Sequence, residues 1–316
     1  MTRSIRTAAA LAVVLASALG HAQPFTFIAL GDTAYNGERD YPVYRALIAA
    51  INKANPAFSI HIGDIWGVGN CHDAHYAQIE GFFASYQQPV VYTPGDNEWT
   101  DCRSNVMGGY DPSERLAKLR NTFYTKPQSL GAHPMALVRE SDVSPYKTFV
   151  ENARWEHDRT LFFTVHVVGS HNNFRPQDRP ALIEANERMQ ANVAWMRDSF
   201  RVAREGGYKA VVMAMHAQML HGDDTEDGPF GAIIEELKLG SERFGGQVLL
   251  VHGDSHQFQV GRPLLVQRGE GEPSLYTNIT RLEVYGAPEI GAVQVSVDPD
   301  TVGVFGFTPL LVPAGS

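Results

Sequence analysis

An α/β fold with a mostly parallel sheet is predicted by two regularities of the sequence. Short apolar runs alternate with stretches of helical character, and three of the runs end in a Gly-Asp pair, at residues 31–32, 63–64 and 95–96. Alternating strands and helices indicate βαβ units, whose strands lie parallel. Continuous apolar strands suit a sheet that is covered on both faces. Because ligands of such sheets bind at the carboxyl ends of the strands, the three aspartates stand where a site is expected.

In the first half of the chain, each element follows this pattern in order. Strands are expected at the apolar runs FTFIAL, FSIHI and PVVY, and helices at the intervening segments YPVYRALIAAINKA and HDAHYAQIEGFFASY. The chain breaks at Pro94-Gly95, directly after the third run. Residues 103–158 are less regular and predict a cap or insert above the site, with a helix in DPSERLAKLRNTFY.

The second half predicts further strands around one long helix. TLFFTVHVVGS (residues 160–170) is a strong strand, and the helix ALIEANERMQANVAWMRDSFRVAREGG stops at Gly206-Gly207. The apolar runs KAVVMAMH and QVLLVHGDSH predict two more strands that end in polar residues. Beyond Phe258, the segments TRLEVYG, GAVQVSVDPD and VGVFGFTPLL alternate, and we interpret them as antiparallel strands that close a second sheet.

Composition bounds the kinds of partner that the protein can have. The chain of 316 residues is 44% hydrophobic and 19% charged, as expected of a compact globular protein. Its formal charge is −9, and no Lys/Arg cluster indicates a nucleic-acid surface. An anionic ligand would therefore need local positive charge, which a metal ion can supply. No pattern in the sequence specifies an oligomeric state.

Residues 1–22 predict a cleaved secretory signal, which leaves residues 23–316 as a single domain. Two arginines precede an apolar run, at residues 8–19, that is too short to span a bilayer. Small residues then allow cleavage after Ala22. An uncleaved anchor is the alternative. We expect an exported protein, periplasmic or secreted, and no later run is long enough for a membrane helix.

The chain contains two cysteines, Cys71 and Cys102. In an exported protein such a pair predicts one disulfide. Each cysteine follows an acidic loop, GDIWGVGN or GDNEWTD, so the bridge would tie those loops together. Two free thiols are the alternative, and a metal-ligand role is weaker because no zinc-finger spacing is present.

Side chains that commonly bind metals stand at the ends of the predicted strands. They are Asp32, Asp64, Asp96, His216, Asp254 and His256. Four carboxylates that converge at one sheet edge repel one another, and buried carboxylates must take up protons or find cations. Divalent metal ions meet this requirement, so we interpret the six residues as metal ligands.

The order of these motifs resembles that of the metallophosphoesterase superfamily, also called calcineurin-like phosphoesterases, and in particular bacterial secreted members of the purple-acid-phosphatase type. Members carry an Asp loop, a Gly-Asp loop, a Gly-Asn-His-Asp/Glu loop, a lone His after a strand and a Gly-His-x-His loop. That order is kept here from Phe25 to His256, and the helix with ANVAWMRDSF is similar to the family's Trp-containing helix. The resemblance implies a four-layer α/β/β/α sandwich of two mixed β-sheets flanked by helices.

The resemblance also implies a role for each matching position. Asp32 matches the Asp of the first motif, and Asp64 matches the Asp that bridges two ions. Asp96 takes the place of the family's Asn ligand. His216 matches the lone His, and His256 matches the last His of the fifth motif.

Three positions depart from the family pattern. Ala34 stands where the first motif has a second ligand, and the next residue, Tyr35, is either a phenolate donor or a ring at the rim of the site. Asn97 replaces the family's His; it can hydrogen-bond a phosphate oxygen but cannot act as a general acid. Asp254 replaces a His ligand in the fifth motif.

These departures imply two metal sites of unequal affinity. One site is hard and anionic, formed by Asp64, Asp96, Asp254 and His216. The poorer site has Asp32, Asp64 and His256 with water, and Tyr35 as a further donor. We expect two divalent or trivalent ions, with Mn, Fe or Mg favoured and Zn as an alternative. A hydroxide that bridges the ions would hydrolyse a phosphomonoester or phosphodiester, with catalytic roles for Asp64, Asn97 and His216.

Further polar residues are expected around the ions. Glu98 and His252 would orient the ligands. The segment with His171, Asn172 and Asn173 follows a strand that points at the same edge. These three would bind a small-molecule phosphate ester or replace the missing imidazole; a plain polar loop is the alternative.

Ala34 and Asn97 also allow a second function class. A catalytically weak metal-binding or surface-interaction protein could keep this scaffold and lose turnover. Asp254 retains the capacity to bind a metal, however, and degenerate proteins usually lose several ligands together. We therefore favour the enzyme.

Overall fold

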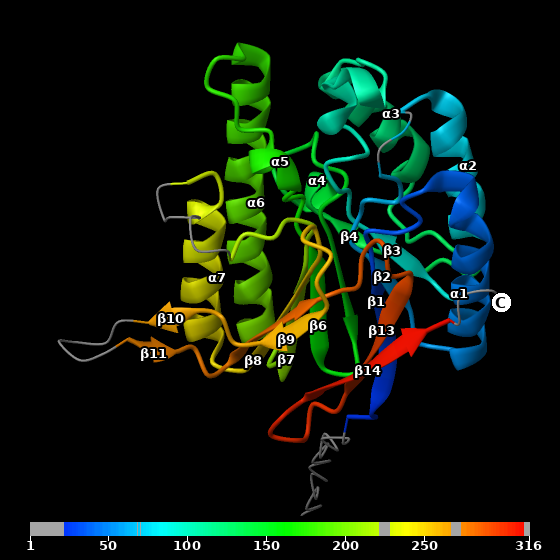
Figure 1. Cartoon of the computed structure of the whole chain (residues 1–316). Helices are drawn as coiled ribbons and strands as arrows, with labels where there is room; N and C mark the ends of the chain where they lie inside the picture. The colour runs from blue at the N-terminus through cyan, green and yellow to red at the C-terminus, as the bar shows by residue number, and fades with distance from the viewer. Residues whose placement is uncertain (1–21, 68, 70, 221–227, 267–272, 313–316) are drawn as a thin grey trace, which may run out of the picture.

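The computed structural model describes residues 22–67, 69, 71–220, 228–266 and 273–312. Two mixed β-sheets pack face to face between two layers of helices (Figure 1). This confirms the α/β/β/α sandwich that the motif order implies. The predicted signal segment lies outside the described residues, apart from Ala22. Among the described residues, no helix is both long and apolar enough to cross a membrane.

The first sheet has the strand order β14-β13-β1-β2-β3. Three of its strands are parallel and correspond to the first three apolar runs: β1 (Phe25–Leu30), β2 (Ser59–His61) and β3 (Val90–Tyr92). Two antiparallel strands complete it: β13 (Gly291–Val297) and β14 (Phe305–Leu311). Its outer face is covered by α1 (Tyr41–Ala54), α2 (Asp73–Ala84) and α3 (Pro112–Phe123).

The second sheet has seven strands in the order β4-β5-β6-β7-β8-β12-β9. Its parallel centre is formed by β6 (Thr160–Thr164), β7 (Ala210–Ala214), β8 (Gln247–His252) and β12 (Ile279–Glu283). Antiparallel strands flank it: β4 (Val138–Arg139), β5 (Ala153–His157) and β9 (Gln259–Gly261). Its outer face is covered by α6 (Arg179–Glu205) and α7 (Gly231–Phe244). The small hairpin of β10 (Leu265–Val266) and β11 (Ser274–Leu275) stands apart.

The strands read as continuous apolar runs because both of their faces are buried. In β1, Phe27 packs between the two sheets and Ile28 packs against the helices. In β7, Val212 likewise packs between the two sheets, and Val211 packs against the helices. Successive side chains of a strand point to opposite faces, so each strand contributes to a central and an outer core.

The interpretation of the C-terminal segments as antiparallel strands that together close a second sheet is correct only in part. β12 pairs in parallel with β8, whereas β13 pairs antiparallel with β1 and β14 extends that pairing. The segments are therefore divided between two sheets that the earlier strands already began. Alternation reports which face of a strand is buried, but it does not report which strand is the neighbour.

Short helices and turns complete the region above the strand ends. They are η1 (Gly37–Arg39), η2 (Asp101–Arg103), η3 (Asn105–Met107), α4 (Glu140–Val143) and α5 (Gly169–Asn172). α3 begins where its sequence indicates, since the Asp111 carboxylate accepts hydrogen bonds from the backbone N–H groups of Ser113 (2.7 Å) and Glu114 (3.1 Å). Within residues 103–158, α3 packs beside α2, while β4 and β5 lie at one edge of the second sheet.

Candidate metal centre

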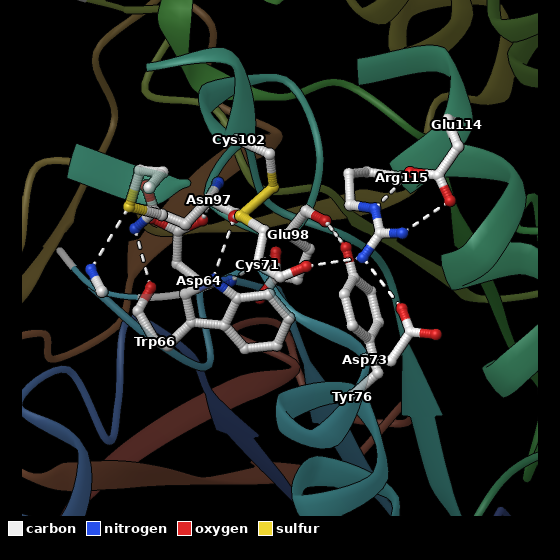
Figure 2. The surroundings of a disulfide bond; sticks show 12 residues. Asp64, Trp66, Cys71, Asp73, Tyr76, Asn97, Glu98, Cys102, Glu114 and Arg115 are labelled. Atoms are coloured by element: carbon white, nitrogen blue, oxygen red, sulfur yellow. Dashed lines mark hydrogen bonds and ion pairs between the residues drawn. A yellow bond between two sulfur atoms is a disulfide. The ribbon is translucent and has the colours of Figure 1, made fainter. Parts of the chain in front are cut away.

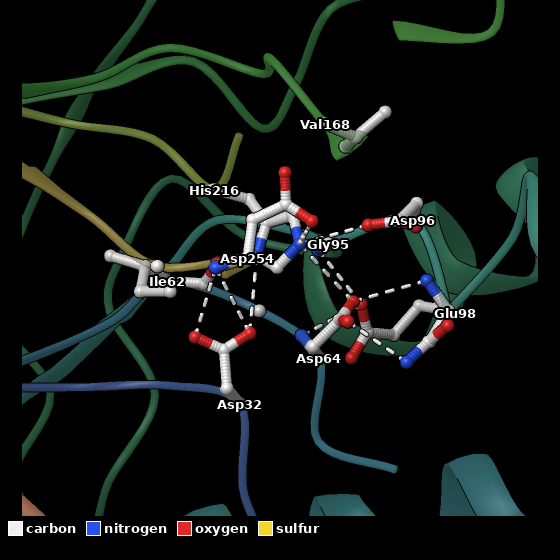
Figure 3. Close-up of polar contacts among 12 residues, drawn as sticks. Asp32, Ile62, Asp64, Gly95, Asp96, Glu98, Val168, His216 and Asp254 are labelled. Atoms are coloured by element: carbon white, nitrogen blue, oxygen red, sulfur yellow. Dashed lines mark hydrogen bonds and ion pairs between the residues drawn. The ribbon is translucent and has the colours of Figure 1, made fainter. Parts of the chain in front are cut away.

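The carboxyl ends of the two sheets bring five acidic or imidazole side chains together (Figure 3). Each follows a parallel strand: Asp32 after β1, Asp64 after β2, Asp96 after β3, His216 after β7 and Asp254 after β8. Their possible ligand atoms form two groups, each within 4.8 Å: Asp32, Asp64 and His216, and Asp96, His216 and Asp254. His216 is common to both groups.

The imidazole of His216 is oriented for metal binding. Its Nδ1 lies 3.0 Å from the carbonyl oxygen of Ile62, which can only accept, so Nδ1 carries the hydrogen. Nε2 then faces three carboxylates, at 2.8 Å from Asp96 Oδ1, 3.5 Å from Asp64 Oδ1 and 3.7 Å from Asp254 Oδ1. A backbone bond at one ring nitrogen that leaves the other for a metal is the usual arrangement of a histidine ligand.

Two buried atoms at this point test whether a cation fits. Asp96 Oδ1 and His216 Nε2 are both buried and lie 2.8 Å apart, and neither has a further hydrogen-bond partner. When Nε2 carries no proton, the lone pairs of the two atoms face each other, and buried lone pairs without a donor are costly. A metal ion would accept a lone pair from each atom and remove that cost, so the residues present fit a metal ion.

The electrostatics of the site favour a cation as well. Burial raises the pKa of Asp32 to about 8, although His216 pulls it down. Burial, with further repulsion from Asp96, holds the pKa of Asp64 well above its ordinary value. Burial opposes a charge on His216, but Asp64, Asp96 and Asp32 outweigh this and raise the pKa of the imidazole. Protons and metal ions therefore compete for the same atoms.

His256 lies beside the first group rather than within it. Its Nε2 is 3.8 Å from Asp32 Oδ1, and its Nδ1 lies 2.9 Å from the carbonyl oxygen of Ala287. Nδ1 therefore carries the hydrogen, and Nε2 is free to bind an ion next to Asp32. The side chain is 23% exposed, whereas that of Asp32 is fully buried, so His256 stands on the solvent side of the centre.

Tyr35 and Asn97 both bind Asp64. The Tyr35 hydroxyl donates to Asp64 Oδ2 at 2.5 Å. Asn97 Nδ2 lies 2.8 Å from Asp64 Oδ2, 2.8 Å from the Tyr35 hydroxyl and 2.9 Å from the Trp66 carbonyl oxygen. Burial and the Asp64 carboxylate raise the pKa of Tyr35, so the phenol keeps its proton as a donor. In this arrangement the Asn97 amide hydrogens are used within the protein.

Glu98 joins the loops that carry Asp64 and Asp96. Its buried carboxylate accepts hydrogen bonds from the backbone N–H groups of Gly95 (2.7 Å), Asp64 (3.1 Å) and Ile65 (2.6 Å). Gly95 has no room for a side chain, because a Cβ there would lie 2.0 Å from Asp64 Oδ1. Through these contacts Glu98 fixes the backbone beside Asp64 and Asp96.

A second buried glutamate, Glu283, has no signal in the motifs. Standing at the end of β12, it accepts hydrogen bonds from Gln218 Nε2 (2.9 Å), the Gln257 backbone (3.3 Å) and the Ser255 hydroxyl. The backbone N–H of Gln218 in turn donates to Asp254 Oδ2 at 2.9 Å. Glu283 therefore links the loop after His216 to the loop that carries Asp254.

His252, buried nearby, has Nδ1 3.1 Å from the carbonyl oxygen of Gly253.

The segment after β6 contacts the centre through residues other than the predicted ones. Asn172 and Asn173 are buried and hydrogen-bond to Arg188 and Glu184, and His171 is exposed. The side chain that reaches the centre is Ser170, whose Oγ lies 3.0 Å from Asp96 Oδ2. Side-chain direction in a turn depends on the backbone angles of each residue, and residue types alone do not report them.

The predicted disulfide between Cys71 and Cys102 is confirmed. Figure 2 shows the disulfide beside Asp64 and Asn97. Its sulfur atoms lie 3.5 and 3.6 Å from the carbonyl oxygen of Asn97. Arg115 fixes the same corner, since its Nη1 donates to the Cys71 carbonyl oxygen at 2.6 Å. The disulfide thus anchors the chain shortly after Asp96 and Asn97 in the sequence.

Loss of the disulfide should destabilise the protein. The two cysteines are 31 residues apart, and closing a loop of that length stabilises a fold by about 3–4 kcal/mol. We expect the double variant Cys71→Ser/Cys102→Ser to lose about this much free energy of unfolding, measured with urea. A reductant should act on the wild type in the same way. An unchanged unfolding midpoint in both cases would contradict this role.

Comparison with known proteins gives structural matches alone. No model of a known protein family matches the chain. No curated protein matches it either. A dimetal phosphatase from Danio rerio is 9% identical with a TM-score of 0.49, and the match covers 92% of this chain and 99% of that chain. GAP50, the anchor in the inner membrane complex of Plasmodium, is 9% identical with a TM-score of 0.45, over 92% of this chain and 90% of that chain. At such values the likeness concerns the course of the backbone, and function has to be argued from the residues of the site.

Proposed function

We propose that this protein is a metal-dependent phosphoesterase with a centre for two ions. The observation that carries the proposal is the pair of ligand groups that meet at His216, where Nε2 and Asp96 Oδ1 are buried 2.8 Å apart with no further hydrogen-bond partner. The order of the motifs along the chain supports the same conclusion, because it resembles that of the metallophosphoesterases.

The ligands divide between two positions. One ion would be held by Asp96, Asp254 and His216, and the other by Asp32 and His256. Asp64 belongs to the first group, with Asp32, and lies 3.5 Å from Nε2 of His216, which belongs to both, so it is our candidate for a ligand that would serve both ions. Oxygen donors dominate the first set, which favours Mn, Mg or Fe. When bound, such ions supply charge to the phosphate oxygens and acidify the attacking water.

The residues around Asp64 have a positioning role in this proposal. Tyr35 and Asn97 donate to Oδ2 of the carboxylate, so they fix the orientation of a side chain that would hold an ion. Glu98 fixes the backbone on the other side. The phosphate ester would then approach from the side of Asp254 and His256, whose side chains are 26% and 23% exposed, whereas those of Asp32 and His216 are fully buried.

Turnover and metal content test the proposal together. Purified protein would be assayed with a chromogenic phosphodiester and a chromogenic phosphomonoester, each with and without added Mn²⁺, and its metal content measured by mass spectrometry. We expect bound metal and metal-stimulated hydrolysis of at least one ester. Metal without turnover would support the catalytically weak metal-binding protein instead, and the absence of any metal uptake would contradict both.

We also propose that the protein is exported, and the disulfide supports this.

A further inference from the structure

The segment that follows Val168 has an unusual backbone. Ser170, His171, Asn172 and Asn173 all have positive φ angles, between 48° and 57°. Residues other than glycine rarely adopt this left-handed conformation, and four in succession cost free energy at each step. Such a turn persists only when its surroundings determine it, and these runs cluster at functional sites.

A buried side chain from α6, Arg188, makes several hydrogen bonds to this turn. Arg188 is fully buried, and its guanidinium can donate five hydrogen bonds. Nη1 donates to Asn172 Oδ1 (2.5 Å) and to the His166 carbonyl oxygen (3.0 Å), and Nη2 donates to the Asn172 carbonyl oxygen (2.9 Å). Nε and Nη2 also bind the two Glu184 oxygens, at 2.7 and 3.1 Å. All five donors are therefore used, and three of them hold the segment from His166 to Asn172.

The same guanidinium also meets the loop that carries Asp96. It lies over the ring of Trp99, 5.3 Å from the ring centroid. Trp99 is buried, and its backbone N–H donates to the Asp96 carbonyl oxygen at 3.2 Å. Asn173 adds a second link, since Oδ1 accepts from Thr100 (3.3 Å) and Nδ2 donates to Glu184 (2.8 Å). Arg188 thus holds the turn and the Asp96 loop in one fixed relation.

The turn is pressed against the ligands of one metal position. A Cβ on Gly169 would lie 2.5 Å from Asp254 Oδ1 and 2.6 Å from Asp96 Oδ1, so the backbone passes directly over both carboxylates. Ser170 Oγ lies 3.0 Å from Asp96 Oδ2 and 2.6 Å from Asp101 Oδ1. Val168, two residues before Ser170, appears beside the site in Figure 3. Displacement of the turn would therefore release the carboxylates of Asp96 and Asp254, the two side chains that Gly169 and Ser170 approach.

We propose that Arg188 is a positioning residue for one of the two metal positions: it clamps the left-handed turn Ser170–Asn173, and the turn holds Asp96 and Asp254 in place. This inference rests on the proposed function, because it names a device for the same centre. It assigns Arg188 to the ion bound by Asp96, His216 and Asp254, and not to the ion beside Asp32.

The experiment compares two variants of the clamp with a matched control. Arg188→Met removes all five donors at similar length. Asn172→Gly removes the side chain that Arg188 binds and keeps a residue that tolerates positive φ. Arg154→Met is the control, because Arg154 also pairs with an acidic side chain of α6 (Asp198, 2.9 Å) and lies 4.6 Å over a tryptophan (Trp195). Two readouts are taken from each full-length protein: Mn²⁺ binding by calorimetry, and amide hydrogen exchange of residues 166–174 after treatment with a chelator.

We expect both clamp variants to exchange at least tenfold faster in residues 166–174. We also expect them to bind the tighter Mn²⁺, the ion assigned to Asp96, His216 and Asp254, at least tenfold more weakly, with the other ion unaffected. The control should match the wild type in both readouts. Faster exchange with two ions bound as in the wild type would overturn the inference, since the turn would then not serve the centre. Unchanged exchange would show that Arg188 does not hold the turn. A wild type that binds no Mn²⁺ at all would instead refute the proposed function, and the exchange readout would still decide whether Arg188 orders the turn.

Discussion

Asp64→Asn should abolish tight metal binding and reduce hydrolysis by more than about 100-fold, since changing the partners of metal ligands alone typically costs about 10–100-fold. Asp64 belongs to one ligand group and also lies 3.5 Å from Nε2 of His216, the residue common to both groups. Asparagine has nearly the same shape, so the variant removes a charge and one acceptor while it preserves packing. Calorimetric titration with Mn²⁺ and the rate of hydrolysis of the chromogenic esters would measure the effect.

The variant should still fold, which separates a metal role from a structural one. Loss of one buried negative charge beside Asp32, Asp96 and Glu98 offsets the hydrogen bonds that Asp64 accepts. In the presence of a chelator, we therefore expect Asp64→Asn to unfold close to the temperature of the wild type. Asp73→Asn, at an exposed carboxylate that pairs with Arg115, is the control and should keep metal and activity. An Asp64→Asn protein with normal Mn²⁺ affinity would remove the basis of the two-ion centre.

Metal addition should stabilise the protein strongly, and more at pH 8 than at pH 5. An ion present at 100 times its dissociation constant contributes about 2.7 kcal/mol, so two ions would raise the unfolding temperature by about 10 °C in a chain of this size. To bind, the ions must displace protons from the centre. Because burial raises the pKa of Asp32 to about 8, this competition weakens as the pH rises toward 8.

The metal-free protein should show the opposite pH dependence. Folded Asp32 retains its proton up to about pH 8, whereas in the unfolded chain it loses the proton near its ordinary value of 3.8. The folded state thus binds more protons between these values, so its stability falls as the pH rises through that window. Thermal unfolding at pH 5 and pH 8, with chelator or with Mn²⁺, measures both trends. A gain from Mn²⁺ that is the same at both pH values would argue against ligands with raised pKa values.

Much of the fold could be predicted because a strand that is buried on both faces has a largely apolar sequence. The runs around Phe27, Ile60 and Val212 are largely apolar, and each forms a parallel strand between two cores. The sequence of a strand does not indicate which sheet the strand joins. β13 meets β1 across more than 260 residues, and this pairing depends on which edge is free once the rest of the chain has packed.

The candidate centre divides in the same way. Asp32, Asp64 and Asp96 could be placed together from sequence, because parallel strands deliver their carboxyl ends to one edge. The direction of Asn97 toward Asp64, the clamp of Arg188 and the link through Glu283 could not. Each of these depends on a contact between distant segments, such as Arg188 with Asn172 or Glu283 with Gln218.

By itself, the sequence determined where strands end and which side chains stand at those ends, because burial and backbone geometry act on neighbouring residues. Only the tertiary structure decided which carboxylates share His216, which hydrogen bonds occupy Asn97, and why the turn after Val168 is left-handed. These features depend on contacts between residues that are far apart in the chain. Such contacts form only when the two sheets pack together.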